Sequence, residues 1–389
     1  MLGSWRPHDD QGIGKSLLTQ LTVLAGASEP GGAKNIALVA KILEGKGILK
    51  ICCSKGATQI LRQADLAFKQ VDHIGTISDA AELLSKTKPT VILTGRGIQP
   101  NSLERLLVRA AHQLGIPSVG LIDEWYDYKA NYSDESGSWN SLPSMICCPD
   151  EQAYQEAIEE GLPPAQLQVT GSPAFAATFD RQKKFRKIPP KRPSITCPSE
   201  AGPVIVFLSE IIHQGSELHS PPESVKSGHS DPGYTEHSVR EDLKDILKAT
   251  FRACTVIEKL HPSAQPETYS VLASPGVDWR ATQDADLDSL FWWADLVVGM
   301  RSAALIEARL LGAPTISFQP NLIGKNRCTA VRKRLIPCFS TKNDLQIWLQ
   351  NRALHSEKEF IARPEFAISQ SVENIVSTLE QTAKRVEAS

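Results

Sequence analysis

Acidic residues that directly follow apolar segments are the groups of this sequence best placed for acid–base chemistry. Asp123 and Glu124 follow an apolar run that begins at Val119, and Glu210 follows a second run, Val204–Leu208. Such runs are typical of buried strands, whose carboxyl ends carry the functional groups of parallel α/β sheets. Burial there raises a carboxyl pKa towards the range useful for proton transfer. We therefore expect catalytic roles for Asp123, Glu124 and Glu210, and the alternative for each is a helix cap or surface turn.

The segment 286–320 combines a helix, a strand and a turn of small residues that opens another helix. Backbone N–H groups at the start of a helix, together with the helix dipole, favour an anion such as a diphosphate. Glu307 lies five residues beyond Ser302, where its carboxylate could accept hydrogen bonds from ribose hydroxyls. Its alternative is a solvated helix position. The residues expected to hold a nucleotide here are Arg301, Ser302, Ala303 and Glu307.

A pair of glycines marks a possible third ligand-binding position. The apolar run Leu21–Gly26 is followed by Pro30-Gly31-Gly32, a strand, loop and helix start. Small residues allow a ligand to approach the backbone there, so Gly31 and Gly32 are candidates for a loop that contacts substrate. A tight turn onto a packed helix explains them equally well. The phosphate-loop-like Gly12–Ser16 is rejected, because no strand precedes it and Asp9 occupies the position of the required first glycine.

Composition and cysteine use limit the classes of function. The formal net charge is −2, so no overall positive field would hold nucleic acid, and we expect none as partner. Two adjacent cysteine pairs, at 52–53 and 147–148, fall in apolar runs and indicate buried thiols in a reducing cytoplasm. The sequence has no run of 18 apolar residues, about the length that a membrane-spanning helix needs. The sequence has no Cys-x-x-Cys, and four of its histidines are spaced too irregularly to predict a metal or other cofactor: His213, His219, His229 and His237.

Apolar runs and amphipathic segments alternate along both halves of the chain. The phrase Leu-Gly-x-Pro occurs at 114–117 and again at 311–314, each time between an expected helix and an expected strand. Glycine ends a helix and proline prevents its continuation. The pattern predicts an α/β protein with two Rossmann-like, doubly wound domains facing across a cleft.

The expected domain boundaries follow changes in composition. We predict a polar leader (1–18), a first domain (19–180), a basic linker (181–198), a second domain (199–370) and a final helix (371–389) that crosses back to the first domain. A block of like charges is usually a solvated connector, and the alternative is a surface for anionic lipid or an anionic substrate. The Ser-, Pro- and His-rich stretch 214–236 is expected to be either a lid or disordered.

The segment 286–320 resembles the donor-binding signature of the GT-B superfamily, which includes glycosyltransferases and non-hydrolysing nucleotide-sugar 2-epimerases. Those proteins share a helix, an aspartate-led strand, a small-residue turn, a helix carrying Glu-Ala, and then Gly-x-Pro. The run 301–304 departs from the glycine-rich turn of the epimerases. Lys259-Leu260-His261-Pro262 resembles the Lys-x-His-Pro of sugar- and polyol-phosphate transferases of this architecture. That resemblance implies that His261 contacts donor phosphate. The first half is similar in layout to the acceptor domain.

The resemblance implies a metal-independent enzyme that transfers a sugar from a nucleotide-sugar donor, in the first instance a UDP-sugar, to an unknown acceptor. Asp123 or Glu124 would then deprotonate the acceptor, and His261 would help to hold the leaving diphosphate. Two alternatives stay open: a nucleotide-sugar 2-epimerase or hydrolase, and a non-catalytic binding protein of the same fold. The expected location is cytoplasmic, with contact to the inner face of the membrane through the basic linker as a further alternative.

Overall fold

The computed structural model describes residues 21–45, 47–97, 99–134, 136–197, 202–212, 232–262, 264, 272–352, 354 and 358–387. The leader predicted for 1–18 lies outside these ranges. So do His213, His219 and His229, and most of the stretch 214–236.

The described part of the first half forms a seven-stranded sheet in the order β3-β2-β1-β4-β5-β6-β7, with every pair parallel. Side chains alternate between its two faces, because Val23 packs with α1, α2 and α14 whereas Leu24 packs with α3 and α4. The strands are β1 (Thr22–Ala27), β2 (Ile48–Cys53), β3 (Lys69–Gln70), β4 (Val91–Thr94), β5 (Ser118–Leu121), β6 (Met145–Cys148) and β7 (Leu167–Val169). The helices are α1 (Pro30–Leu43), α2 (Lys55–Gln63), α3 (Ile77–Thr87), α4 (Leu103–Leu114), α5 (Tyr128–Tyr132), α6 (Glu151–Glu159) and α7 (Pro173–Lys187).

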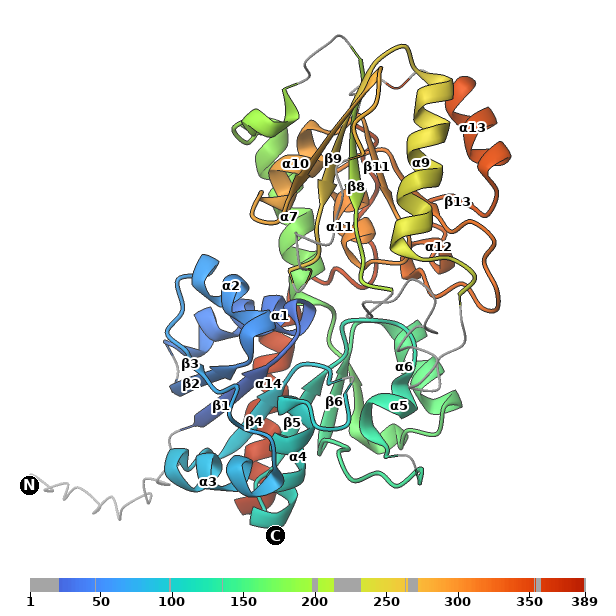
Figure 1. The fold of residues 1–389 in the computed structure, drawn as a ribbon. Coiled ribbons are helices and arrows are strands. Elements are labelled where there is room, and N and C mark those ends of the chain that lie inside the picture. Colours follow the sequence, from blue (N-terminus) through green and yellow to red (C-terminus); the bar gives the residue numbers. More distant parts are fainter. Residues whose placement is uncertain are drawn as a thin grey trace, which may run out of the picture.

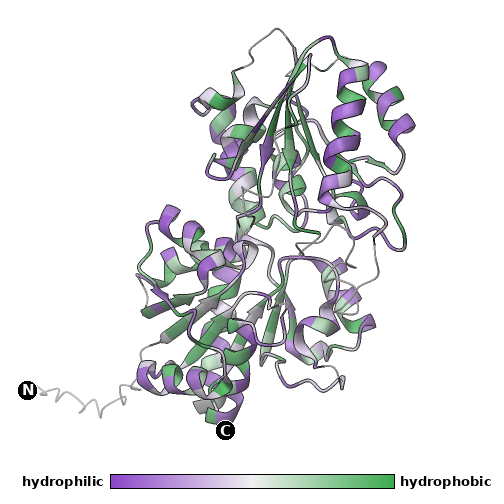
Figure 2. Cartoon of the chain, viewed as in Figure 1, coloured by the Kyte–Doolittle hydropathy of each residue, from purple (hydrophilic) through white to green (hydrophobic). Residues whose placement is uncertain are grey.

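The second half builds a six-stranded sheet from its described residues, again parallel, in the order β10-β9-β8-β11-β12-β13. Figure 2 shows hydrophobic strands inside both sheets and hydrophilic outer faces on the surrounding helices. The strands are β8 (Val204–Leu208), β9 (Cys254–Lys259), β10 (Val277–Thr282), β11 (Leu296–Gly299), β12 (Thr315–Phe318) and β13 (Cys338–Phe339). The helices are α9 (Glu236–Thr250), α10 (Leu287–Trp293), α11 (Ala304–Leu310), α12 (Thr329–Arg332) and α13 (Lys342–Gln350).

Two connections between the domains are visible in Figure 1. Helix α7 leaves the first domain and packs against α11 of the second, so residues 181–187 of the predicted linker are helical. The final helix α14 (Ser371–Glu387) returns to the first domain, where Ile375, Val376 and Leu379 are buried against its sheet. The two doubly wound domains and the returning helix are confirmed.

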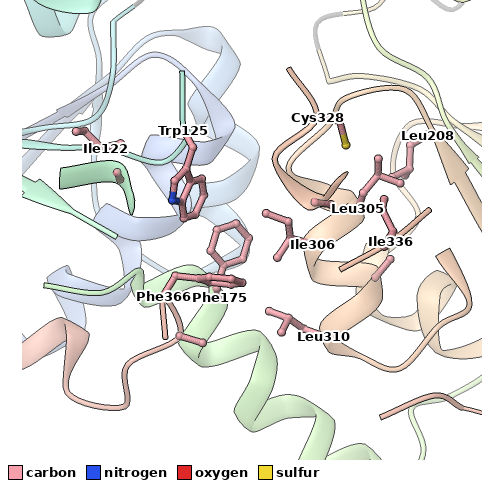
Figure 3. Packing of buried hydrophobic residues seen from close by; sticks show 14 of the residues in the cluster. Ile122, Trp125, Phe175, Leu208, Leu305, Ile306, Leu310, Cys328, Ile336 and Phe366 are labelled. Atoms are coloured by element: carbon pink, nitrogen blue, oxygen red, sulfur yellow. The ribbon is translucent and has the colours of Figure 1, made fainter. Parts of the chain in front are cut away.

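One hydrophobic cluster spans both domains (Figure 3). Trp125, Phe175 and Phe366 pack together with ring centroids 5.4–5.9 Å apart. Leu305 and Ile306 of α11 belong to the same buried cluster. The domains therefore share a core, and separating them would expose apolar surface to water.

A buried lysine of the second domain reinforces this contact. The Lys333 side chain is 6% exposed, and its ammonium group pairs with Asp150, which is 1% exposed. That ammonium also lies 4.9 Å from the ring centroid of Trp125 and 5.3 Å from that of Phe366. Trp125 in turn donates from Nε1 to Asp150 Oδ1 at 2.8 Å. A charge pair buried in this way is favourable only while both partners stay together.

We predict that Lys333→Met lowers the free energy of unfolding by about 3–5 kcal/mol, because it leaves the Asp150 carboxylate buried without its cation. The double variant Lys333→Met/Asp150→Asn should recover much of this loss, since no buried charge then remains. Urea unfolding measures both, and the exposed Lys86→Met serves as control. A double variant no more stable than the single one would contradict the explanation.

Candidate functional site

The strand order of the first sheet reverses between β1 and β4. Doubly wound sheets bind their ligands at such a switch point. The start of α1 packs directly on the loop after β4: a Cβ on Gly32 would lie 3.0 Å from Gly95 Cα, and one on Gly95 would lie 2.9 Å from Gly32 Cα. A side chain at Gly95 would therefore displace backbone, and one at Gly32 would be tightly crowded. The close approach to Gly95 explains why position 32 is glycine. A contact between Gly32 and a ligand stays a prediction.

Gly31 makes room for the first predicted acid. Asp123 follows β5, and a Cβ on Gly31 would lie only 2.2 Å from Asp123 Oδ2. The Asp123 side chain is 14% exposed. Burial raises its pKa to about 6, against the lowering effect of Arg96 and with a further increase from Glu124. Gly31 was predicted as part of a ligand-binding loop and Asp123 as an acid–base group. The structure brings the two into contact.

Arg96, which the sequence analysis did not name, organises the acids at this edge of the sheet. It follows β4, is 5% exposed, and donates from Nη2 to Glu124 Oε2 at 2.7 Å. Its Nε lies 3.8 Å from Asp123 Oδ1, and its guanidinium lies 4.9 Å from the Tyr126 ring centroid. Arg96 Nη1 and Asp123 Oδ1 are buried without a hydrogen-bond partner among the described residues. A donor and an acceptor left in this way are suited to a ligand hydroxyl or amide.

Two further carboxyl groups, Glu29 and Glu104, are buried near this site. Burial raises the pKa of Glu29, against the effect of Arg96. Glu104 of α4 is 2% exposed and accepts from the Ser28 N–H at 2.6 Å. Burial raises the pKa of Glu104 to about 7, although its hydrogen bonds from Ser28 oppose this shift. Several carboxyl groups thus lie near a single guanidinium group, that of Arg96. The excess of acids favours the protonated form of some of them near neutral pH.

In the second domain Glu210 occupies the corresponding switch point, between β8 and β11. Its Oε1 accepts from the backbone N–H groups of Met300, Arg301 and Ser302 at 3.0, 2.7 and 2.9 Å. Burial raises the pKa of Glu210, opposed by Arg301 and by these N–H groups. The N–H groups predicted to bind a diphosphate are therefore the ones that Glu210 contacts. In this structure the Glu210 carboxylate occupies them. Ala303 lies directly after the turn, as the N-cap of α11.

Glu307 is an interdomain partner and not a solvated helix residue. Both of its oxygens accept from Lys34 Nζ of α1, at 2.7 and 2.8 Å, and its side chain is 8% exposed. His261 follows β9, and burial together with the neighbouring Lys259 lowers its pKa, which favours the neutral imidazole. Burial lowers the pKa of Lys259, and Lys34 lowers it further. His261, Lys259, Lys34 and Glu307 are thus linked electrostatically.

Arg301, the remaining predicted residue, interacts across the domain boundary. Arg301 interacts electrostatically with Tyr126 and Glu124 of the first domain as well as with Glu210. Arg327 of the second domain pairs with Asp127 at 3.0 Å. The structure therefore joins Asp123, Glu124, Glu210 and Arg301 into one region through Arg96 and Tyr126.

The described residues contain no group of three or more His, Cys, Asp or Glu side chains suited to a metal ion. Of the four irregularly spaced histidines only His237 is described, and it is half-buried on α9. Within the described part of the chain no helix is both long and apolar enough to cross a membrane.

A scan against protein-family models gives no match, and a search of curated proteins gives none either. Among solved structures, the chain is similar to the UDP-GlcNAc 2-epimerase of Neisseria meningitidis bound to UDP-GlcNAc, with TM-score 0.66, 15% identity, and coverage of 93% of this chain and 100% of that one. The corresponding values for the UDP-GlcNAc 2-epimerase of Methanocaldococcus jannaschii with UDP-GlcNAc and UDP are 0.64, 15%, 92% and 99%. The chain has a GT-B fold. At such low identity the similarity concerns the fold alone.

The buried Glu104 predicts a pH-dependent stability. An acid whose folded pKa, about 7, exceeds its ordinary 4.5 favours the folded state while protonated. That contribution is complete below about pH 4.5 and is lost as pH rises through about 7. Relative to Glu104→Gln, the wild type should therefore lose up to about 3 kcal/mol of unfolding free energy between pH 4.5 and 8.5. Urea titrations across this range measure the difference, with the exposed Glu159→Gln as control. A constant difference between wild type and Glu104→Gln would contradict the prediction.

Proposed function

We propose that this protein is an enzyme that acts on nucleotide-activated sugars, as a nucleotide-sugar 2-epimerase or a related hydrolase. Asp123 would be the group that transfers protons during the reaction. The observation that carries the proposal is the carboxyl group of Asp123, which is largely buried, has a pKa of about 6, and lies beside Arg96 at the end of β5. The fold shared with UDP-GlcNAc 2-epimerases supports the substrate class and a UDP-sugar as the first donor to test.

The chemistry of inversion suits this group. Inversion at sugar C2 removes a proton from one face while the C1–O bond to the diphosphate breaks, and the C2–C1 double bond takes up the electron pair. Return of the diphosphate to C1 and of a proton to the other face of C2 completes it, so groups that accept and release protons near neutral pH are needed. A pKa of about 6 lies in that range. Arg96 would hold Asp123 and Glu124 in place, and its unpartnered Nη1 would donate to an oxygen of the sugar.

We assign the diphosphate to Arg301, Ser302, Ala303 and His261, and the ribose to Glu307. In the bound state the phosphate oxygens replace the Glu210 carboxylate on the N–H groups of the turn, and Glu307 exchanges Lys34 for ribose hydroxyls. The phosphate oxygens would thus take over the position of an internal anion, Glu210, and the ribose hydroxyls that of an internal cation, Lys34. Developing negative charge on a leaving diphosphate would be stabilised there.

Transfer of the sugar to an acceptor is a second candidate, because deprotonation of an acceptor hydroxyl needs the same base, Asp123 or Glu124. The hydrogen bonds that Glu210 makes to the turn favour a third candidate, a binding protein without turnover, since they compete with the diphosphate.

The first test incubates UDP-GlcNAc and other UDP- and GDP-sugars with the protein in the absence of acceptor, with the sugar followed by NMR. We expect inversion at C2 or hydrolysis, and a loss of about 10²–10⁴-fold in turnover for Asp123→Asn, the range for removal of a general acid–base group. Nucleotide affinity should be retained, and Asp245→Asn on α9 is the control.

The alternatives give different results in the same experiment. Consumption of the sugar only when an acceptor is added would identify a transferase. Binding without turnover, unchanged in Asp123→Asn, would identify a binding protein. If no nucleotide sugar binds at all, the proposed function is wrong.

A second test compares the two partners of the interdomain pair. Glu307→Ala should weaken nucleotide binding by about 1.5–3 kcal/mol, or ten- to a hundredfold, because it removes a charged acceptor of ribose hydrogen bonds. Lys34→Ala removes the same salt bridge but no predicted ligand contact, so affinity should change much less. Calorimetric titration measures affinity, and melting curves measure the stability that both variants lose. Equal affinities in the two variants would remove Glu307 from the site.

A further inference from the structure

The basic segment at the end of α7 forms an exposed surface, here called the basic patch: Lys183, Lys184, Arg186, Lys187, Lys191 and Arg192. The sequence contains no acidic residue between Asp180 and Glu200. The whole chain has a formal net charge of −2, so this patch is a local concentration of positive charge and not part of a general excess.

Helical geometry separates the patch from the core. Gln182 is 2% exposed and donates to the Leu310 carbonyl of α11 at 2.7 Å. Phe185 packs against Trp292 with ring centroids 5.4 Å apart. Lys183 and Lys187 lie four residues apart and therefore share a face of α7 away from these two contacts. The helix is thus fixed on the second domain while its cations stay in solvent.

Most cations of the patch lack an acidic partner. Some exposed lysines elsewhere have one, as Lys86 has in Glu82 and Lys342 has in Asp242. In the patch Lys183 pairs with Asp180 at 3.4 Å, whereas the other members have no carboxylate partner among the described residues. The two arginines instead stack on aromatic rings. Arg186 lies 4.7 Å from the Phe360 ring centroid, and Arg192 lies 5.3 Å from that of Trp293.

An apolar side chain stands among these charges. Ile188 is 79% exposed, although isoleucine is one of the residues most often buried. Phe360, beneath Arg186, is 39% exposed. Trp293 Nε1 donates to the Pro190 carbonyl at 3.0 Å, which holds the segment after Ile188 against α10. The exposed isoleucine is therefore presented by a fixed segment.

We propose that the basic patch docks on an anionic membrane surface, with the lysines and arginines at the lipid phosphates and Ile188 inserted between the headgroups. Lys and Arg near anionic lipid each add to binding, and an inserted apolar side chain adds a term that does not depend on salt. A nucleic acid would use the same cations but offers nothing that buries Ile188, so the combination favours lipid. The inference does not depend on the proposed catalytic activity.

The test floats the full chain with vesicles of phosphatidylcholine, with and without phosphatidylserine. We expect binding only to the anionic vesicles, and weakening as added salt shortens the Debye length from about 8 Å to about 3 Å. Lys184→Gln/Lys187→Gln/Lys191→Gln should weaken binding about a hundredfold, because each lysine contributes about fivefold. The control, Lys41→Gln/Lys55→Gln/Lys69→Gln, makes the same change of charge on exposed lysines of the first domain and should leave binding unchanged.

Ile188→Ser separates lipid from other polyanions. It should weaken binding to anionic vesicles at every salt concentration and leave binding to a single-stranded RNA probe unchanged. Failure to bind anionic vesicles, equal binding to neutral ones, equal loss in the control triple variant, tighter binding to the RNA than to vesicles, or an Ile188→Ser variant that binds vesicles normally would each overturn the proposal. Turnover of soluble sugar nucleotides should be unchanged in all these variants.

Discussion

The burial of Lys333 of the second domain against Trp125 of the first constrains much of the candidate site. Trp125 lies two residues beyond Asp123, so the same short segment carries the proposed acid and the interdomain contact. Arg332 donates to the Trp125 carbonyl, and Arg327 pairs with Asp127. Contacts from the second domain therefore fix this segment in addition to those made by Arg96. Because charges desolvated in this way are costly to separate, the position of Asp123 depends on how the domains are docked.

This arrangement also governs how charge is distributed near the site. Arg96 pairs with Asp123 and Glu124 in the first domain, and Arg301 pairs with Glu210 in the second. Lys34 of the first domain pairs with Glu307 of the second. A diphosphate entering this region would bring negative charge to groups that are already matched. It can bind favourably only by releasing internal carboxylates from the cations and N–H groups that it needs. Ligand affinity in such a site reflects a difference between two sets of ionic contacts, and not the ligand contacts alone.

Much of the fold follows from sequence patterns, and the site follows in part. Uninterrupted apolar runs predicted the central strands, and the carboxyl ends of those strands identified Asp123, Glu124 and Glu210. Strand β10 was missed because Trp279 alternates with the charged Asp278 and Arg280. The end of α7 was taken for a linker because its charges hide a narrow buried face that contains Gln182.

Arg96 and Lys34 were missed for a different reason. The importance of each depends on a partner distant in sequence, Glu124 and Glu307 respectively, which no local pattern reveals. The strand-end rule that found Asp123 applies equally to Arg96, which lies two residues after β4. The role of Lys34 required the docked domains to be known.

The turn 300–302 shows how an acid can stabilise a helix start from a neighbouring strand end. Glu210 accepts hydrogen bonds from the N–H groups of Met300, Arg301 and Ser302. Arg301 and Glu210 depend on each other, because the carboxylate needs a nearby cation when buried and the arginine lies 3.7 Å from it. A change of the turn alone would leave one of these charges uncompensated. The turn and the acid therefore act as one unit, in which each buried charge is compensated by the other.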